Sequence, residues 1–179
     1  MLELELSEKE LYDEETNQFV YTKPITLRLE HSLVSLSKWE AKWKTPFLSN
    51  KNLTNEQALD YIKCMTITQN VDDNVYKALN QSDLKKIEAY ISEEQTATTF
   101  AKTNEPPNRQ VITSELIYFW MASYNIPMEC QKWHLSRLLT LIRIASIKNQ
   151  PEKKMSKNAI LNRNKSLNAA RRKAMHSKG

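Results

Sequence analysis

Cys130 and His134 are the residues whose types and spacing come nearest to a catalytic pair. If both lie on one helix, a separation of four residues puts the thiol and the imidazole on the same face, where the imidazole can activate the nucleophile. The reaction also requires an oxyanion hole, usually built from backbone amides at a strained turn or a helix N-terminus. Because the sequence offers no loop suited to this, we expect a core cysteine beside a partly buried histidine and predict no catalytic residue.

Glycine is nearly absent, because Gly179 is the single glycine among 179 residues, against about twelve at the usual frequency of roughly 7%. Loops that bring a ligand close to the backbone or hold a phosphate depend on residues without a Cβ atom. The dinucleotide-binding fingerprint and the P-loop both need several glycines at fixed spacing, so the sequence contains neither. The two cysteines and three histidines are scattered without metal-binding spacing, and we therefore expect neither a cofactor nor a metal ion.

The N-terminal elements that must support any site are predicted to be strands, because apolar and polar residues alternate there. Leucines occupy every second position of residues 2–6, and an apolar alternation recurs over residues 25–29. Between them we expect a polar turn over residues 13–17 and a return strand around Phe19 and Tyr21. About three antiparallel strands are too few to be stable alone. Helices must therefore cover the leucine face.

From Ser32 onward the apolar spacing becomes helical. We predict a first helix that Ser32 caps and Pro46 ends. A second helix opens with a capping box formed by Thr54 and Gln57. A third helix begins near Ser82.

The most apolar part of the chain follows a polar loop over residues 92–109. Thr113 is placed to cap a helix over residues 114–124. Pro127 suits the first position of the next helix, which we expect to run over residues 128–147. This second helix is apolar over more than half of its circumference, so it must be buried on two sides or held by a partner.

The charge distribution divides the chain in two. Residues 148–179 contain ten Lys or Arg and one acid, a net charge of +9, whereas residues 1–147 carry a net charge of −4. We predict an α+β, mainly helical fold, with a domain over residues 1–147 in which a small N-terminal antiparallel sheet packs on helices. Residues 148–179 are predicted to form a basic C-terminal helical tail.

The sequence does not predict an association with a membrane. Its longest apolar stretches fall far short of the roughly 20 residues that span a bilayer. The N-terminus is acidic and alternating, unlike a signal peptide. We expect the protein in a cytoplasm.

Two groups of residues are candidates for binding a partner. Trp39 and Trp43 lie on a predicted helix dense in lysine, so we expect them to be half exposed and able to anchor an interface. The basic tail can bind a protein partner, neutralise the phosphates of a nucleic acid, or serve no specific partner. It has no aromatic residue on which bases could stack, so nucleic acid is the weaker alternative. The tail candidates are Lys153, Lys154, Arg163, Lys165, Arg171, Arg172 and Lys173.

The C-terminal half also resembles a known family. The motifs that carry the likeness are SELIYFW at residues 114–120, NIPMECQKWHLSRLLTLIR at residues 125–143, KMSK at residues 154–157 and RNKSLNAARRK at residues 163–173. They are similar to small proteins encoded in the tail gene clusters of long-tailed bacteriophages, the tail assembly chaperones. The likeness covers residues 112–179 closely and the N-terminal strand and helix more loosely.

The resemblance implies a non-enzymatic protein that binds the phage tape measure protein and keeps its helices soluble while tail-tube subunits polymerise around it. It implies a location in the host cell cytoplasm, it is compatible with a homo-oligomer, and it supplies no catalytic residue. Two alternatives stay open. One is a structural virion component, such as a connector, tail or capsid-associated subunit, and the other is a nucleic-acid-binding accessory protein that acts through the basic tail.

Overall fold

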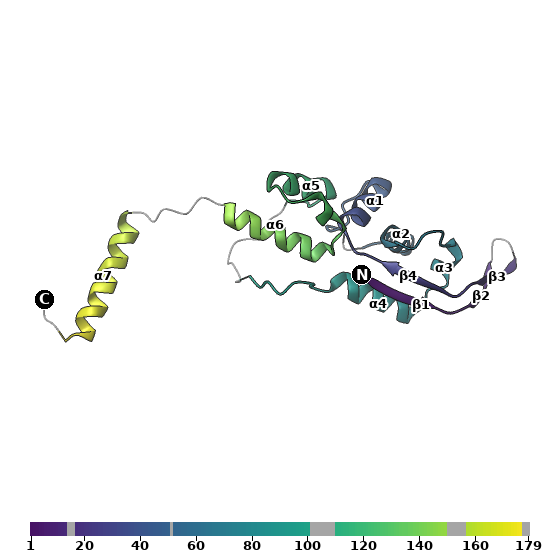
Figure 1. Cartoon of the computed structure of the whole chain (residues 1–179), viewed down its shortest axis with the longest axis horizontal. Coiled ribbons are helices and arrows are strands. Elements are labelled where there is room, and N and C mark those ends of the chain that lie inside the picture. Colours follow the sequence, from purple (N-terminus) through teal and green to yellow (C-terminus); the bar gives the residue numbers. More distant parts are fainter. Residues whose placement is uncertain (14–16, 51, 101–109, 150–156, 177–179) are drawn as a thin grey trace. The chain divides into compact units, whose positions relative to one another are not determined.

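The protein is described by a computed structural model that covers residues 1–13, 17–50, 52–100, 110–149 and 157–176 (Figure 1). The chain divides into two units, Met1–Ile147 and Lys148–Gly179. The first unit combines antiparallel strands with helices, and the second contains one helix in its described part. This confirms the predicted α+β, mainly helical class.

Three predictions fall wholly or partly outside the described residues. They are the polar turn over residues 13–17, the second half of the loop over residues 92–109 and the start of the tail at residues 148–156. Lys153 and Lys154 belong to the last of these segments.

The N-terminal residues form a two-stranded antiparallel hairpin, and the prediction of about three strands was wrong. Two pairs of strands follow one another along this hairpin. We call the pair β1 and β4 the base and the pair β2 and β3 the outer ribbon. The strands are β1 (Leu2–Leu6), β2 (Lys9–Asp13), β3 (Gln18–Thr22) and β4 (Ile25–Leu29).

The two pairs share one register, so the hairpin is interrupted rather than re-paired. Leu6 lies opposite Ile25 and Lys9 lies opposite Thr22, which means that both strands advance by three residues across the gap. Pro24 lies in this gap, and a proline has no N–H to donate to a ladder. The break in pairing therefore coincides with the one residue of these strands that cannot complete it.

The helices of the first unit begin at capping residues that the sequence supplies. The side chains of Ser32, Thr54 and Asn80 each accept a hydrogen bond from the backbone N–H three residues later, and the backbone N–H of each donates in return to the side chain of that later residue. The first two caps confirm the predicted starts, whereas the short helix α3 was not predicted. The helices are α1 (Leu33–Trp43), α2 (Asn55–Met65), α3 (Asp73–Lys77), α4 (Gln81–Ser92), α5 (Ser114–Ser123) and α6 (Leu135–Asn149).

The predicted helix over residues 128–147 is broken into two elements. Met128–Lys132 forms a 3-10 helix, and α6 starts only at Leu135. Between them the backbone of His134 is extended and forms a bridge with Ser32, and the Leu135 N–H donates to the His31 carbonyl oxygen at 2.7 Å. The chain therefore leaves the helical path in order to hydrogen-bond the segment that joins β4 to α1.

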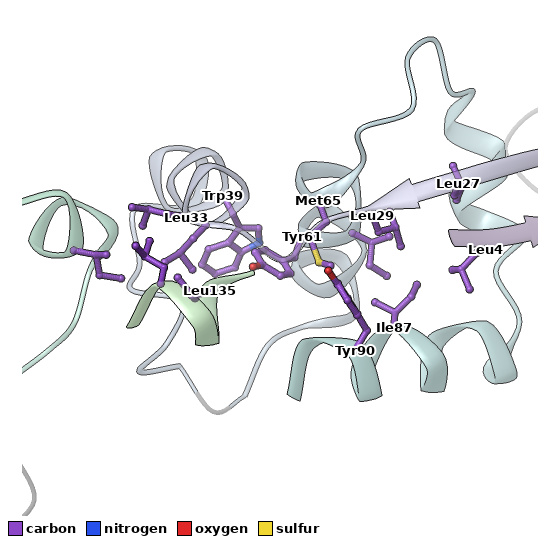
Figure 2. Packing of buried hydrophobic residues seen from close by; sticks show 14 of the residues in the cluster. Leu4, Leu27, Leu29, Leu33, Trp39, Tyr61, Met65, Ile87, Tyr90 and Leu135 are labelled. Atoms are coloured by element: carbon purple, nitrogen blue, oxygen red, sulfur yellow. The ribbon is translucent and has the colours of Figure 1, made fainter. Parts of the chain in front are cut away.

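The core lies where the base of the hairpin meets the helices. Leu4, Leu27 and Leu29 are buried, and Figure 2 shows Leu4 and Leu29 in one cluster with Ile87 of α4. Trp39 of α1 packs in the same cluster. The helices therefore cover the leucine face of the base, as expected.

The chain turns without glycine. Among the described residues, every left-handed backbone position belongs to a residue that carries a Cβ atom. Lys44, for example, has φ 54° at the end of α1, a place where glycine is common. The left-handed residues are Asn17, Lys44, Asn70, Asn125 and His176.

The second unit contains the helix α7 (Lys157–Ala174). Its apolar residues Ile160, Leu161 and Leu167 are exposed. Across the described parts of both units, a helix with the length and apolar character to cross a membrane is not found.

Candidate partner-binding surfaces

Cys130 and His134 do not share a helical face, because Cys130 belongs to the 3-10 helix and His134 to the extended link before α6. The sequence-based placement of the two residues on one helix was wrong. Both are buried. The ring nitrogens of His134 make hydrogen bonds to the Ser136 hydroxyl at 2.8 Å and to the Tyr90 carbonyl oxygen at 3.0 Å. In this arrangement His134 ties α6 to the end of α4.

A second buried histidine packs against the first. The rings of His31 and His134 lie 5.1 Å apart, and His31 Nδ1 hydrogen-bonds the Tyr61 hydroxyl at 2.6 Å. Burial, together with the smaller effect of the neighbouring His134, lowers the pKa of His31 to about 4. Burial also raises the pKa of Tyr61 above its ordinary value. His31 and Tyr61 are therefore both uncharged at neutral pH. The cluster that they form with His134 holds β4, α2 and α6 together.

Trp39 is not half exposed, so this part of the sequence-based expectation was wrong. Its side chain is fully buried, and its indole N–H donates to the Gln57 carbonyl oxygen at 2.9 Å. Figure 2 shows Trp39 beside Tyr61 and Leu135 in the core. The lysines of α1, Lys38 and Lys42, are exposed on either side of the buried Trp39 in the sequence, which is why a lysine-rich sequence concealed a core residue.

Trp43 is partly buried and lies against α2. Its indole N–H donates to the Asp60 carboxylate at 2.9 Å, and Lys42 forms a salt bridge with the same carboxylate. Trp43 thus fastens α1 to α2, and both tryptophans have structural contacts in this chain.

An apolar groove runs between α5 and α6. It encloses about 290 Å³. Trp120 and Tyr124 form its α5 wall, and Leu139 and Ile142 form its α6 wall. Arg143 and Ser146 complete the lining. The groove is a part of the surface of α5 and α6 that the core leaves accessible.

A second apolar face of α6, which includes Ile144, lies away from the residues that line the groove. Only Leu135, Leu138 and Ile142 of this helix are fully buried, whereas Ile144 is half-buried and Ile147 is 52% exposed. From the sequence we expected α6 to be buried on two sides or held by a partner. In the structure, α6 has one buried face and one accessible apolar face.

Two arginines of α6 stack on aromatic rings, and one of them, Arg143, lines the groove. The Arg143 guanidinium lies 4.0 Å from the centroid of the Phe100 ring, and the Arg137 guanidinium lies 4.4 Å from the centroid of the Trp133 ring. Such contacts keep the guanidinium groups flat on aromatic faces while their charge stays accessible. Arg143 therefore places one positive charge at the edge of the apolar groove.

The outer ribbon carries exposed aromatic side chains, of which only Phe19 and Tyr21 were expected in a strand. Tyr12, Phe19 and Tyr21 are each more than half exposed, at 53%, 62% and 64%. The Tyr12 and Phe19 ring centroids lie 5.2 Å apart, and the Tyr21 hydroxyl donates to the Glu10 carboxylate at 2.5 Å. One sign of this exposure was available once the two strands were aligned. Tyr21 lies opposite Glu10, whereas a tyrosine on a buried face would lie opposite an apolar residue.

The other face of the outer ribbon is the one that turns toward the body. Lys9 and Val20 are partly buried and Thr22 is buried, and the Lys9 ammonium donates to the Ala78 carbonyl oxygen at 2.7 Å. In the base, by contrast, the buried residues are the even-numbered ones of β1, such as Leu4. The covered face thus changes side across the gap at Pro24, and the aromatic residues are left outside.

The basic residues of α7 form the third surface. Within the described residues of this helix all charged side chains are basic and exposed. Because residues seven and eleven apart lie on one side of a helix, Ile160, Leu167 and Arg171 share a face. Of the candidate tail residues, those in the described helix are Arg163, Lys165, Arg171, Arg172 and Lys173.

Within the described residues, no group of three or more His, Cys, Asp or Glu side chains is arranged to hold a metal ion. No protein-family model, curated protein or solved structure matches the chain. Three surfaces therefore remain as candidates for function, namely the groove between α5 and α6, the outer ribbon and the basic face of α7.

Proposed function

We propose that this protein is a non-enzymatic phage tail assembly chaperone that binds amphipathic helices of the tape measure protein. The observation that carries the proposal is the apolar groove between α5 and α6. The segment that bears this groove is also the segment in which the sequence resembles tail assembly chaperones.

The chemistry of the groove suits a helix better than a small molecule. Helix-in-groove recognition uses apolar side chains at positions i, i+3, i+4 and i+7, which insert between aromatic and aliphatic walls. Trp120 and Tyr124 on one wall and Leu139 and Ile142 on the other supply such walls. Arg143 at the edge favours a partner helix with acidic residues flanking its apolar stripe.

A long tape measure protein needs this kind of cover before the tail tube encloses it. Helices with uncovered apolar stripes associate with one another in water. A partner that occupies each stripe reversibly keeps them soluble and yields its place to tail-tube subunits. This role places the protein in the host cell cytoplasm.

The test is coexpression with the tape measure protein from the same gene cluster. Ser146→Arg puts a long charged side chain into the groove at a partly exposed position. We expect the variant to remain folded and to recover at least fivefold less soluble tape measure protein than the wild type. Ser82→Arg, at an exposed position of α4, is the matched control and should behave as the wild type.

Two outcomes would overturn the proposal. Equal recovery of tape measure protein with wild type, Ser146→Arg and an empty vector would remove the chaperone role. Detection of the protein at fixed stoichiometry in purified particles by mass spectrometry would assign it to the virion as a structural component. DNA binding that falls steeply with salt, without any effect on the tape measure protein, would support the nucleic-acid accessory role instead.

A further inference from the structure

The outer ribbon and the helix α7 have complementary charge. Residues 9–22, the span of the outer ribbon, contain four acidic residues and one basic residue, whereas Lys157–Ala174 contains six basic residues and no acidic residue. On the outer ribbon, Glu10 is exposed next to the aromatic residues. The two elements attract one another over the distance at which surface charges act, about 8–10 Å at physiological salt.

Their apolar parts are complementary as well. The outer ribbon exposes Tyr12, Phe19 and Tyr21 on one face. Along α7, Ile160 and Leu167 form a narrow apolar stripe and are both 45% exposed. An isolated helix of this kind is marginally stable in water, so contact with an apolar surface stabilises it.

Arg171 can contribute to both the charge contact and the contact with the aromatic rings. It lies on the same side of α7 as Ile160 and Leu167. A guanidinium at this place can pair with the Glu10 carboxylate and stack on the face of a neighbouring tyrosine or phenylalanine ring.

The geometry of the body favours a helix from another copy of the chain. The hairpin extends about 35 Å from Leu29 to Gln18 at roughly 3.3 Å per residue. The helix α6 begins at the foot of the hairpin, where the Leu135 N–H meets the His31 carbonyl oxygen, and it runs about 21 Å in the opposite direction at 1.5 Å per residue (Figure 1).

The chain's own tail is too short to bring Ile160 to the outer ribbon. Seven residues separate Asn149 from Lys157, and even a fully extended segment of this length spans at most about 29 Å. The outer ribbon lies roughly 50 Å from the end of α6. Ile160 is in the first turn of α7, so it can reach the aromatic residues only from a second copy.

We propose that the outer ribbon of one copy binds the helix α7 of a second copy, with Ile160 and Leu167 on the rings of Tyr12, Phe19 and Tyr21 and with Arg171 paired to Glu10. Each chain carries one donor and one acceptor surface, so the contact is head-to-tail. This self-association is separate from the groove between α5 and α6 and from the binding of a tape measure protein.

The test uses the full chain alone, in sedimentation velocity over a range of concentrations. We expect a concentration-dependent association that weakens as salt is raised. Glu10→Lys and Arg171→Glu should each weaken it at least tenfold, and the chain that carries both changes should recover most of the loss because the pair is restored with its charges exchanged. Phe19→Ser should weaken association without changing any charge.

Matched controls separate this contact from a general effect of charge. Lys165→Glu reverses a charge on another side of α7, and Glu88→Lys reverses one at an exposed position of α4. Both should weaken association less than threefold. A circular dichroism spectrum equal to that of the wild type shows that each variant is folded.

Three outcomes would overturn the proposal. The first is a chain that stays monomeric at every concentration. The second is association that the Glu10, Phe19 and Arg171 variants leave unchanged. The third is a crosslink between outer ribbon and α7 whose yield does not fall on dilution, which would put the chain's own tail on the ribbon. None of these experiments contains a tape measure protein, so their failure does not bear on the proposed chaperone function.

Discussion

The base and the outer ribbon belong to one hairpin with one register, yet they have opposite environments. In the base, Leu4 lies opposite Leu27, and both are buried under helices. In the outer ribbon, Tyr12 lies opposite Phe19, and both are exposed. Cross-strand pairing alone therefore does not decide the role of a strand. The helices that cover it decide whether its apolar pairs stabilise the fold or are accessible to a partner.

The largest expected difference between the two halves is in stability. Leu27 is fully buried in the base. Leu27→Ala removes buried methyl groups and leaves a cavity, so we expect the free energy of unfolding to fall by about 2–5 kcal/mol. Urea denaturation followed by tryptophan fluorescence measures this loss. A fall below about 1 kcal/mol would mean that the base is not part of the core.

The next prediction concerns the link between the base and the helices. His31 directly follows the end of β4, is 5% exposed and has a pKa lowered to about 4. In the unfolded chain a histidine has a pKa near 6.5, so below that pH the unfolded state takes up a proton that the folded state does not. Stability should therefore fall as the pH drops from about 6.5 to about 4, by up to roughly 3 kcal/mol from this residue, and should lose nothing more through it below that range.

A substitution isolates the contribution of His31. His31→Asn keeps a polar side chain near the Tyr61 hydroxyl but does not titrate in this range. Urea denaturation at pH 7.0, 5.5 and 4.5 should show a smaller loss of stability with acid in the variant than in the wild type. Identical pH dependence in the variant and the wild type would show that His31 takes up its proton over the same pH range in the folded and the unfolded state.

The smallest expected effect on stability belongs to the outer ribbon. Phe19→Ala changes a side chain that is 62% exposed, so we expect the free energy of unfolding to change by no more than about 0.5 kcal/mol. The same urea experiment as for Leu27→Ala provides the measurement. A loss comparable to that of Leu27→Ala would erase the distinction between the two halves and would make the outer ribbon part of the folded core.

The helices that could be predicted are those whose signals are local. The capping boxes at Ser32 and Thr54 fix the starts of α1 and α2, and the side chain of Thr113 caps α5 as predicted. Each signal depends on residues within one turn of the helix. Such signals act in the same way whatever the rest of the chain does.

The features that could not be predicted depend on contacts between distant segments. His134 interrupts the predicted helix because its backbone pairs with Ser32, about a hundred positions earlier in the chain. The strand β2 was missed because its sequence KELYD lacks the apolar alternation that burial on one face would impose. The exposure of Phe19 likewise depends on where the helices end rather than on its neighbours in sequence.

The candidate surfaces were predictable to different degrees. The excess apolar character of α6 was visible in the sequence, since it follows from counting residues around a helix. The burial of Trp39 was not, because the neighbouring lysines of α1 gave the helix a polar composition. The groove itself requires the crossing of α5 and α6, which neither helix encodes alone.

The left-handed residues without glycine have a consequence for the unfolded chain. A glycine samples more backbone conformations than any other residue and therefore loses more entropy when the chain folds. Residues such as Asn70 and Asn125 adopt the same turns in the folded state, but with a Cβ atom they restrict the denatured ensemble, an effect of about 0.4–1 kcal/mol for each position where the conformation is tolerated. Part of the stability of this small body therefore originates in a denatured chain that is stiffer than usual. Replacing such an asparagine with glycine would relieve local backbone strain in the folded state but would raise the conformational entropy of the unfolded state.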